Sequence, residues 1–162
     1  MPTTEENSKN IWNSTRSKTV ANFFTLGYSG RTLDDIIKSL LDYHVATLVD
    51  IRANPLSQHR PQFNKRNLSR EFGTYGIQYV HRPDLGVPKV VRGLIKDDNL
   101  DSVWEWYDKY VIPDFVDSDL KNYQNLARHP LAFMCTELDP FSCHRHRLAL
   151  AIEAKGLKSF DL

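Results

Sequence analysis

The stretch FFTLGYSGRTLDDIIKSLLDYHVATLVDIRA, residues 23–53, determines the fold class. It opens with a short apolar run that ends in Gly and Ser, which is typical of a buried strand followed by a turn. The middle part repeats apolar residues at helical spacing, and Thr32 can cap that helix. Residues 47–53 predict a second strand. A strand, a helix and a second strand of these lengths predict a β-α-β unit with parallel strands.

The same alternation continues to the end of the chain. Helices are expected near residues 64–75, 103–111, 114–128 and 143–155, and further strands are expected at residues 77–82, 131–137 and 157–162. Strands that alternate with helices indicate a mostly parallel sheet covered by helices on both faces. The sequence therefore predicts an α/β fold of the Rossmann-like, three-layer kind with four or five strands.

Composition and length indicate one compact domain. A chain of 162 residues can bury one core but is short for two ordinary domains. Residues 1–21 have no apolar period, so we expect a flexible N-terminal arm followed by a single α/β domain at residues 22–162. The sequence has no apolar stretch of membrane-spanning length and no secretory signal pattern. We therefore expect a cytoplasmic protein that does not enter a membrane.

Charge is distributed unevenly along the chain. Residues 52–70 carry five Arg and Lys side chains and no acidic residue, whereas residues 97–119 carry eight Asp and Glu side chains against a single Lys. This pattern predicts that one side of the molecule attracts anions while another repels them.

Polar side chains collect where the predicted strands end. In open parallel sheets the ligand crevice lies beyond the carboxyl ends of the strands. The polar residues at these ends are Ser29, Asp50, Arg52, His81, Cys135 and Glu137. Because Asp50 and Arg52 interrupt an apolar strand, each needs a partner, so they either line a site or form a structural ion pair.

The segment MCTELDPFSCHRHR, residues 134–147, carries the densest group of reactive side chains. A helix that begins near Cys143 would offer free backbone N–H groups and a forked donor, Arg145, to an anion. The same field would favour a thiolate at Cys143, and a buried, inert cysteine is the alternative. His144 is a candidate acid or base in the same turn.

Metal binding and sulfur transfer are less well supported at this segment. Cys135, Cys143, His144 and His146 are ligand types, but no C-x-x-C pair occurs. Adjacent Cys143 and His144 would point in different directions from a helix, so no metal site is expected. LVDIR resembles a strand of rhodanese-like domains, yet Glu137 would repel the anion that such a loop binds.

The basic loop, residues 53–65, leaves the second strand with several groups that suit a phosphate. Arg52, Arg60, Asn64 and Lys65 are the expected substrate contacts there. Phe63 either stacks on a base or packs against the helix that follows.

Four motifs together resemble the family called domain of unknown function 488. They are TLGYSGRTL (25–33), LVDIRANPLSQHRPQFNK (48–65), YVHRPDLG (79–86) and CTELDPFSCHRHRLA (135–149). The similarity covers nearly all of the chain after residue 22. The resemblance implies a Rossmann-like α/β domain whose biochemical role is not established.

Three hypotheses for function follow. The first is an enzyme that acts on a phosphate-bearing substrate, a nucleotide or nucleic acid, with acid, base or nucleophile among Asp50, His81, Glu137, Cys143 and His144. Its binding residues would be Ser29, Arg52, Arg60, Asn64, Lys65, Cys135 and Arg145. The second is a non-catalytic module that binds a nucleotide or nucleic acid, and the third is a thiol or metal site. The sequence indicates neither a cofactor nor an oligomeric state.

Overall fold

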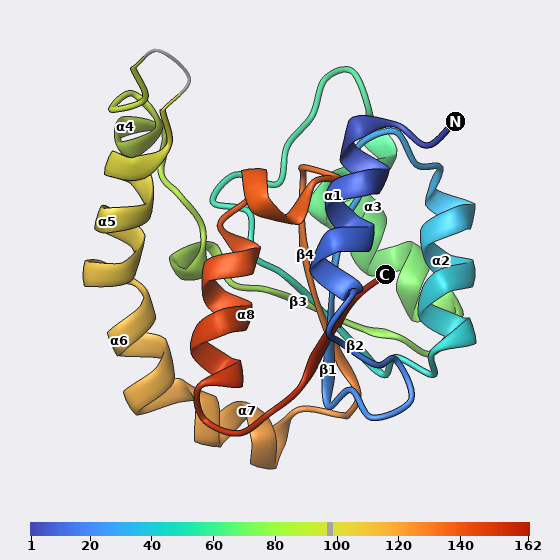
Figure 1. Ribbon diagram of the computed structural model, residues 1–162. Coiled ribbons are helices and arrows are strands. Elements are labelled where there is room, and N and C mark those ends of the chain that lie inside the picture. The colour runs from blue at the N-terminus through green and yellow to red at the C-terminus, as the bar shows by residue number, and fades with distance from the viewer. Residues whose placement is uncertain (97–98) are drawn as a thin grey trace.

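A computed structural model of the chain describes residues 1–96 and 99–162 (Figure 1). Five strands of this part form one parallel sheet in the order β3-β2-β4-β1-β5. The strands are β1 (Phe23–Gly27), β2 (Thr47–Asp50), β3 (Gln78–His81), β4 (Leu131–Cys135) and β5 (Ser159–Asp161). The predicted α/β, Rossmann-like class is confirmed.

The helices connect these strands on both sides of the sheet. They are α1 (Thr4–Asn13), α2 (Leu33–Asp42), α3 (Lys65–Thr74), α4 (Lys89–Arg92), α5 (Asp101–Tyr110), α6 (Ile112–Asp114), α7 (Leu120–Leu126) and α8 (Arg145–Glu153). A π-helical turn, Phe115–Asp119, interrupts the helical stretch between α6 and α7. Three short 3-10 turns occur at Pro61–Phe63, Pro83–Leu85 and Pro140–Ser142. Thr32 caps α2 as expected, because its side chain accepts the N–H of Asp35.

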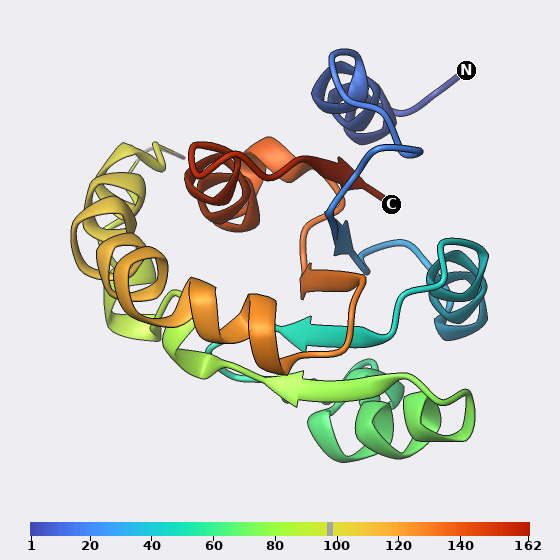
Figure 2. The same ribbon diagram turned by 90° about the horizontal axis from the view of Figure 1, so that it is seen from below.

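Two apolar layers fill the space between the sheet and the helices. Figure 2 shows α2 and α3 on one side of the sheet, with α5, α7 and α8 on the other. Side chains of β4 alternate between the layers: Phe133 and Cys135 face the α5–α8 side, whereas Met134 faces the α2–α3 side. This alternation directs Cys135 toward the start of α8, where the second cysteine lies.

Part of the N-terminal segment expected as a flexible arm, residues 1–21, forms the helix α1. The Thr3 and Glu6 side chains cap the helix reciprocally, and Trp12 is buried with 3% exposure. The Arg16 guanidinium pairs with Glu153 of α8 at 2.9 Å. The sequence of α1 shows no apolar period, because Trp12 is its single buried residue. The boundary of the α/β domain at residue 22 stays a prediction.

Two carboxylates of the acidic stretch at residues 97–119, Asp108 and Asp119, form internal ion pairs. Arg82 binds Asp84 and Asp119, each at 2.5 Å, and Arg147 binds Asp108. Asp97 and Asp98 lie outside the described residues. Within residues 1–96 and 99–162, no helix has the length and apolar character needed to cross a membrane.

Candidate functional site

Asp50 and Arg52 form an enclosed ion pair at the end of β2. The side chain of Asp50 is fully buried and that of Arg52 is 5% exposed. Arg52 donates to both carboxylate oxygens, at 2.9 and 2.6 Å, and to the carbonyl of Phe63 at 2.8 Å. The Tyr79 hydroxyl donates to the same carboxylate at 2.6 Å. The structural ion-pair interpretation fits this geometry, because Nε, Nη1 and Nη2 of Arg52 all donate to internal acceptors.

Contacts within this network shift the pKa values of Arg52 and Tyr79. Burial lowers the pKa of Arg52, but the hydrogen bond and negative charge of Asp50 outweigh burial, and the net shift is upward. Burial and the same carboxylate raise the pKa of Tyr79. His81, at the end of β3, is half-buried and its Nε2 bonds the carbonyl of Arg52 at 2.9 Å. His81 therefore belongs to this network.

The basic loop is held against the protein by its own side chains. Phe63 is fully buried, stacks on Tyr28 with ring centroids 4.4 Å apart, and shares an apolar cluster with Leu68 and Phe72 of α3, which favours packing over stacking on a base. Arg60 donates to the carbonyls of Tyr28 and Arg31, and its guanidinium lies 4.2 Å over the Phe63 ring. These contacts leave Arg60 little freedom to bind phosphate.

Asn64 and Ser29, expected in the basic loop and at the end of β1, make internal hydrogen bonds, whereas Lys65 is exposed. The Asn64 side chain accepts the N–H of Ser57 at 2.5 Å, which closes the loop before α3. Lys65 is exposed on α3. The N–H of Ser29 donates to the carbonyl of Thr136 at 2.9 Å, which ties β1 to the segment after β4.

Arg145 serves the fold, so its expected contact with an anion is corrected. It is 1% exposed and its Nε lies 3.1 Å from an oxygen of Asp161 in β5. The other guanidinium nitrogens donate to the carbonyls of Glu137 and Leu138. Arg145 therefore joins β5 to the loop after β4, and its donors are used by Asp161 and by two carbonyls of that loop.

Cys135, Cys143 and His144 meet in one place, which we call the cysteine cluster. Their ligand atoms all lie within 4.8 Å of one another. The three residues are 0%, 1% and 2% exposed, respectively. The Cys135 sulfur lies 3.8 Å from each ring nitrogen of His144. Two thiols and an imidazole are thus packed together in the protein interior.

The backbone explains how adjacent side chains reach the same point. Cys143 is extended, with φ −128° and ψ 141°, and α8 begins only at Arg145. The helix expected to start at Cys143 starts two residues later, so Cys143 and His144 do not diverge as neighbours on a helix would. The expected divergence of Cys143 and His144 therefore no longer argues against a metal site.

The imidazole of His144 is fixed from two sides. Its Nε2 lies 3.3 Å from the carbonyl oxygen of Ile51, just after β2. Its ring lies 5.2 Å from the ring of Tyr107 in α5, centroid to centroid, and the Tyr107 hydroxyl donates to the carbonyl of Leu85 at 2.7 Å. If Nε2 carries the proton and donates it to Ile51, then Nδ1 keeps its lone pair for the thiols.

Proton affinities differ strongly within the cluster. Burial raises the pKa of Cys135 well above its ordinary value. Burial also acts to raise the pKa of Cys143, but hydrogen bonds from Cys135 and His144 and the charge of Arg145 outweigh it and lower that pKa well below its ordinary value. Burial and the negative charge of Cys143 raise the pKa of Glu137. Of the two thiols, Cys143 is therefore the one that loses its proton more readily.

A cavity of about 130 Å³ opens beside the cluster, and we call it the cysteine cavity. Glu137, Ser142, Cys143 and His144 line one part of it, and the remaining lining comes from Val87, Arg92, Ile95, Leu100, Val103 and Trp104. The side chain of Glu137 is 33% exposed and that of Arg92 is 45% exposed, with their charged atoms 3.9 Å apart. The cavity therefore combines sulfur, imidazole, carboxylate and guanidinium groups.

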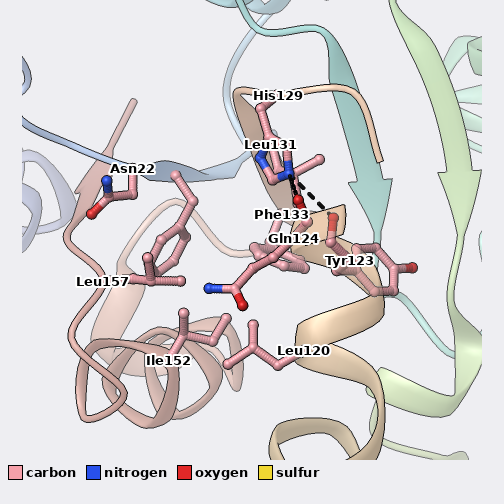
Figure 3. Close-up of a pocket in the computed structure, with 10 residues that line it drawn as sticks. Asn22, Leu120, Tyr123, Gln124, His129, Leu131, Phe133, Ile152 and Leu157 are labelled. Atoms are coloured by element: carbon pink, nitrogen blue, oxygen red, sulfur yellow. Dashed lines mark hydrogen bonds between the residues drawn. The ribbon is translucent and has the colours of Figure 1, made fainter. Parts of the chain in front are cut away.

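A different cavity, of about 290 Å³, lies at the opposite end of the strands (Figure 3). It is lined mainly by apolar side chains near the beginnings of β1 and β4, such as Phe23, Leu131 and Ile152. His129 lies at this cavity, but its Nε2 is bonded to the carbonyls of Tyr123 and Gln124, at 3.2 and 3.0 Å. The larger cavity offers volume without reactive groups, so we take the cysteine cavity as the candidate site.

The structure thus divides the expected site residues into two groups. Cys135, Glu137, Cys143 and His144 converge at the cysteine cavity or directly behind it. Asp50, Arg52, His81 and Arg145 form internal networks. The sequence analysis missed Arg92, because a lone arginine in a loop with Gly and Pro carries no pattern that points to a site.

A comparison with known protein families matches most of the chain. Residues 32–152 match the family model described as Domain of unknown function DUF488. The chain belongs to this family. The match covers the basic loop and the cysteine cluster, and begins at Thr32, near the end of the first motif quoted for the resemblance. No curated protein and no solved structure matches this chain.

Proposed function

We propose that this DUF488 protein is an enzyme that acts on a phosphate-bearing substrate in the cysteine cavity. The observation that supports this most directly is the set of Glu137, Cys143 and His144 on one cavity wall with Arg92 beside them. The cavity lies beyond the carboxyl ends of β2 and β4, where ligands of open parallel sheets bind.

The proposed reaction is hydrolysis of a phosphate ester. Arg92 holds the phosphate through its forked donors. A water oxygen forms a bond to phosphorus, the bond from phosphorus to the leaving oxygen breaks, and Glu137 carries the proton of the water to that leaving oxygen. Water is the only co-reactant. Among the described cavity-lining residues, Glu137 supplies the only carboxylate.

Cavity size limits which part of the substrate enters. A volume of about 130 Å³ is well below the roughly 300–1,000 Å³ of pockets that enclose a whole small molecule. The phosphate group enters the cavity, and the rest of a nucleotide or nucleic acid stays at the surface. Free cysteines suit a reducing compartment, so a cytoplasmic location remains part of this proposal.

A substrate panel tests the proposal. Purified protein is incubated with phosphomonoesters, phosphodiesters and nucleotides, and the released phosphate or alcohol is measured. We expect turnover of at least one class, and a loss of about 100-fold or more in kcat for Glu137→Gln. Arg92→Ala should raise KM. Glu105→Gln and Arg128→Ala, two exposed positions outside the cavity, are matched controls. Equal turnover in Glu137→Gln and wild type would overturn the assignment.

A non-catalytic binding module is the second candidate, and one observation favours it. Lys65, Arg66 and Arg70 are exposed along α3 and form a cationic surface suited to a nucleic-acid backbone. In that case nucleic-acid affinity falls steeply with salt and with replacement of these residues by Ala, and is unchanged in Glu137→Gln. Filter binding at several salt concentrations separates the two candidates.

A further inference from the structure

The ligand atoms of the cysteine cluster have the composition and spacing of a zinc site. Tetrahedral zinc with bond lengths of about 2.3 Å to sulfur and 2.0–2.1 Å to nitrogen holds its ligand atoms roughly 3.5–3.8 Å apart. Cys135 Sγ already lies 3.8 Å from the His144 ring nitrogens, and all three ligand atoms lie within 4.8 Å. Movements of the ligand atoms by about 1 Å or less complete the tetrahedral arrangement.

We propose that Cys135, Cys143 and His144 bind one Zn²⁺ ion whose fourth position opens into the cysteine cavity. Cys143 and His144 line that cavity, whereas Cys135 lies behind them, so a bound ion has protein ligands on one side and the cavity on the other. Three protein ligands with an open fourth position are the arrangement of catalytic zinc sites.

The surroundings of the cluster supply the support that metal ligands need. A histidine ligand usually donates its second ring N–H to a carboxylate or carbonyl, which fixes its orientation. His144 has this partner, because its Nε2 faces the carbonyl oxygen of Ile51 at 3.3 Å. Nδ1 is then the nitrogen that binds the ion. Cys135 is the last residue of β4 and Cys143 follows a 3-10 turn, so both thiols are held by regular structure.

A bound ion also suits the charge of the proposed substrate. Zn²⁺ and the two thiolates that bind it are neutral as a unit, so the occupied cluster does not repel a phosphate. This step rests on the proposed function. The ion would bind and polarise either the attacking water or a phosphoryl oxygen, and Glu137, whose Oε2 lies 3.7 Å from the Cys135 sulfur, stands beside it.

Metal analysis of the full-length chain tests the proposal. Protein is purified without chelator, incubated with ZnCl₂ and freed of unbound metal, and its zinc content is measured. We expect about one zinc per chain in the wild type, and Co²⁺ substitution should give thiolate-to-cobalt absorption typical of tetrahedral sites. Zinc should also protect both thiols from a thiol-titrating reagent, and a chelator should restore their reactivity.

Variants show whether the cluster is the binding site. Cys135→Ser, Cys143→Ser and His144→Ala should each lose most of the zinc, whereas His129→Ala and Glu137→Gln should retain it. Circular dichroism identifies any variant that fails to fold. For such a variant, the wild-type thiol protection decides the question. Wild-type protein that is folded, free of zinc after incubation and equally thiol-reactive with or without ZnCl₂ overturns the proposal.

The outcomes separate this proposal from the proposed function. Zinc bound at the cluster without turnover of any phosphate ester leaves the metal site standing and removes the phosphoesterase. Glu137-dependent turnover in protein that stays free of zinc after incubation with ZnCl₂ leaves the phosphoesterase standing and removes the metal site.

Discussion

Gly27 shows how a single residue fixes the distance between β1 and the candidate site. A Cβ built on Gly27 would lie 1.8 Å from the carbonyl oxygen of Glu137, so the loop after β4 lies directly against the end of β1. Arg145 holds the same loop from the other side through the carbonyls of Glu137 and Leu138. The position of the Glu137 carboxylate therefore depends on residues that do not line the cavity.

We predict that Gly27→Ala destabilises the protein by about 1–3 kcal/mol, because backbone must move to admit the methyl group. The control is Gly73→Ala in α3, where no atom lies within 4 Å of the new Cβ. That change should be neutral or stabilising by up to about 1 kcal/mol, since alanine favours helix. Urea unfolding of both variants measures the difference, and equal effects would contradict the close approach at Gly27.

The buried pair of Arg145 and Asp161 gives a second prediction at this scale. Their side chains are 0% and 1% exposed, so Arg145→Ala leaves a buried carboxylate without its partner and should cost about 3–5 kcal/mol. Lys38→Ala, which breaks the exposed pair with Asp42, should leave the unfolding midpoint unchanged. A small effect of Arg145→Ala in denaturant unfolding would show that the loop is held by other contacts.

At the scale of elements, α1 is attached to the domain by few contacts. Trp12 packs into the core, Asn13 bonds the backbone of Asp161, and Arg16 pairs with Glu153 at the end of α8. Arg16 also stacks over the Trp12 ring at 3.8 Å. Because these contacts are concentrated at the end of α1, a change in one of them should loosen the whole helix.

We predict that α1 loosens in acid through Glu153. Burial acts to raise the pKa of Glu153, but hydrogen bonds from Arg16 and Ser159 outweigh it, and the net pKa lies below the ordinary value of 4.5. A group with a lowered folded-state pKa stabilises the fold above its unfolded pKa, and this stability is lost as pH falls through the folded pKa. Proteolysis within residues 1–21 should therefore accelerate below pH 4.5. Glu153→Gln should show faster cleavage already at neutral pH, with a weaker acid dependence.

At the scale of the whole molecule, the cysteine cluster lies where several elements meet. Cys135 ends β4, Cys143 and His144 lead into α8, the His144 ring contacts the carbonyl after β2, and Tyr107 of α5 lies against it. An ion bound to the cluster would connect elements that are far apart in the chain. Metal binding should consequently stabilise the entire fold and not only the loop after β4.

We predict that zinc at 100 times its dissociation constant raises the free energy of unfolding by about 2.7 kcal/mol. For a chain of this size, that corresponds to a rise in Tm of roughly 5–10 °C. Differential scanning calorimetry with ZnCl₂ and with a chelator measures the shift, and Cys143→Ser should show none. A shift of equal size in Cys143→Ser would place the stabilising ion elsewhere.

The sequence by itself determined the alternation of strands and helices, because apolar periodicity and caps such as Thr32 act over a few neighbouring residues. It also located the polar ends of the strands. Tertiary structure decided which polar groups are free: Arg145 is occupied by Asp161 of β5, and Arg52 by the carbonyl of Phe63. Such partners come from long-range packing, which local patterns do not encode.

Tertiary structure also decided the composition of the candidate site. The segment of residues 134–147 contains both cysteines, but their approach depends on the extended backbone of Cys143 and on the start of α8 at Arg145. Arg92 joins the site because it ends α4, 3.9 Å from the carboxylate of Glu137. A shift of one or two residues in a helix boundary redirects every side chain nearby, which is why the sequence located this segment and the structure assembled the site.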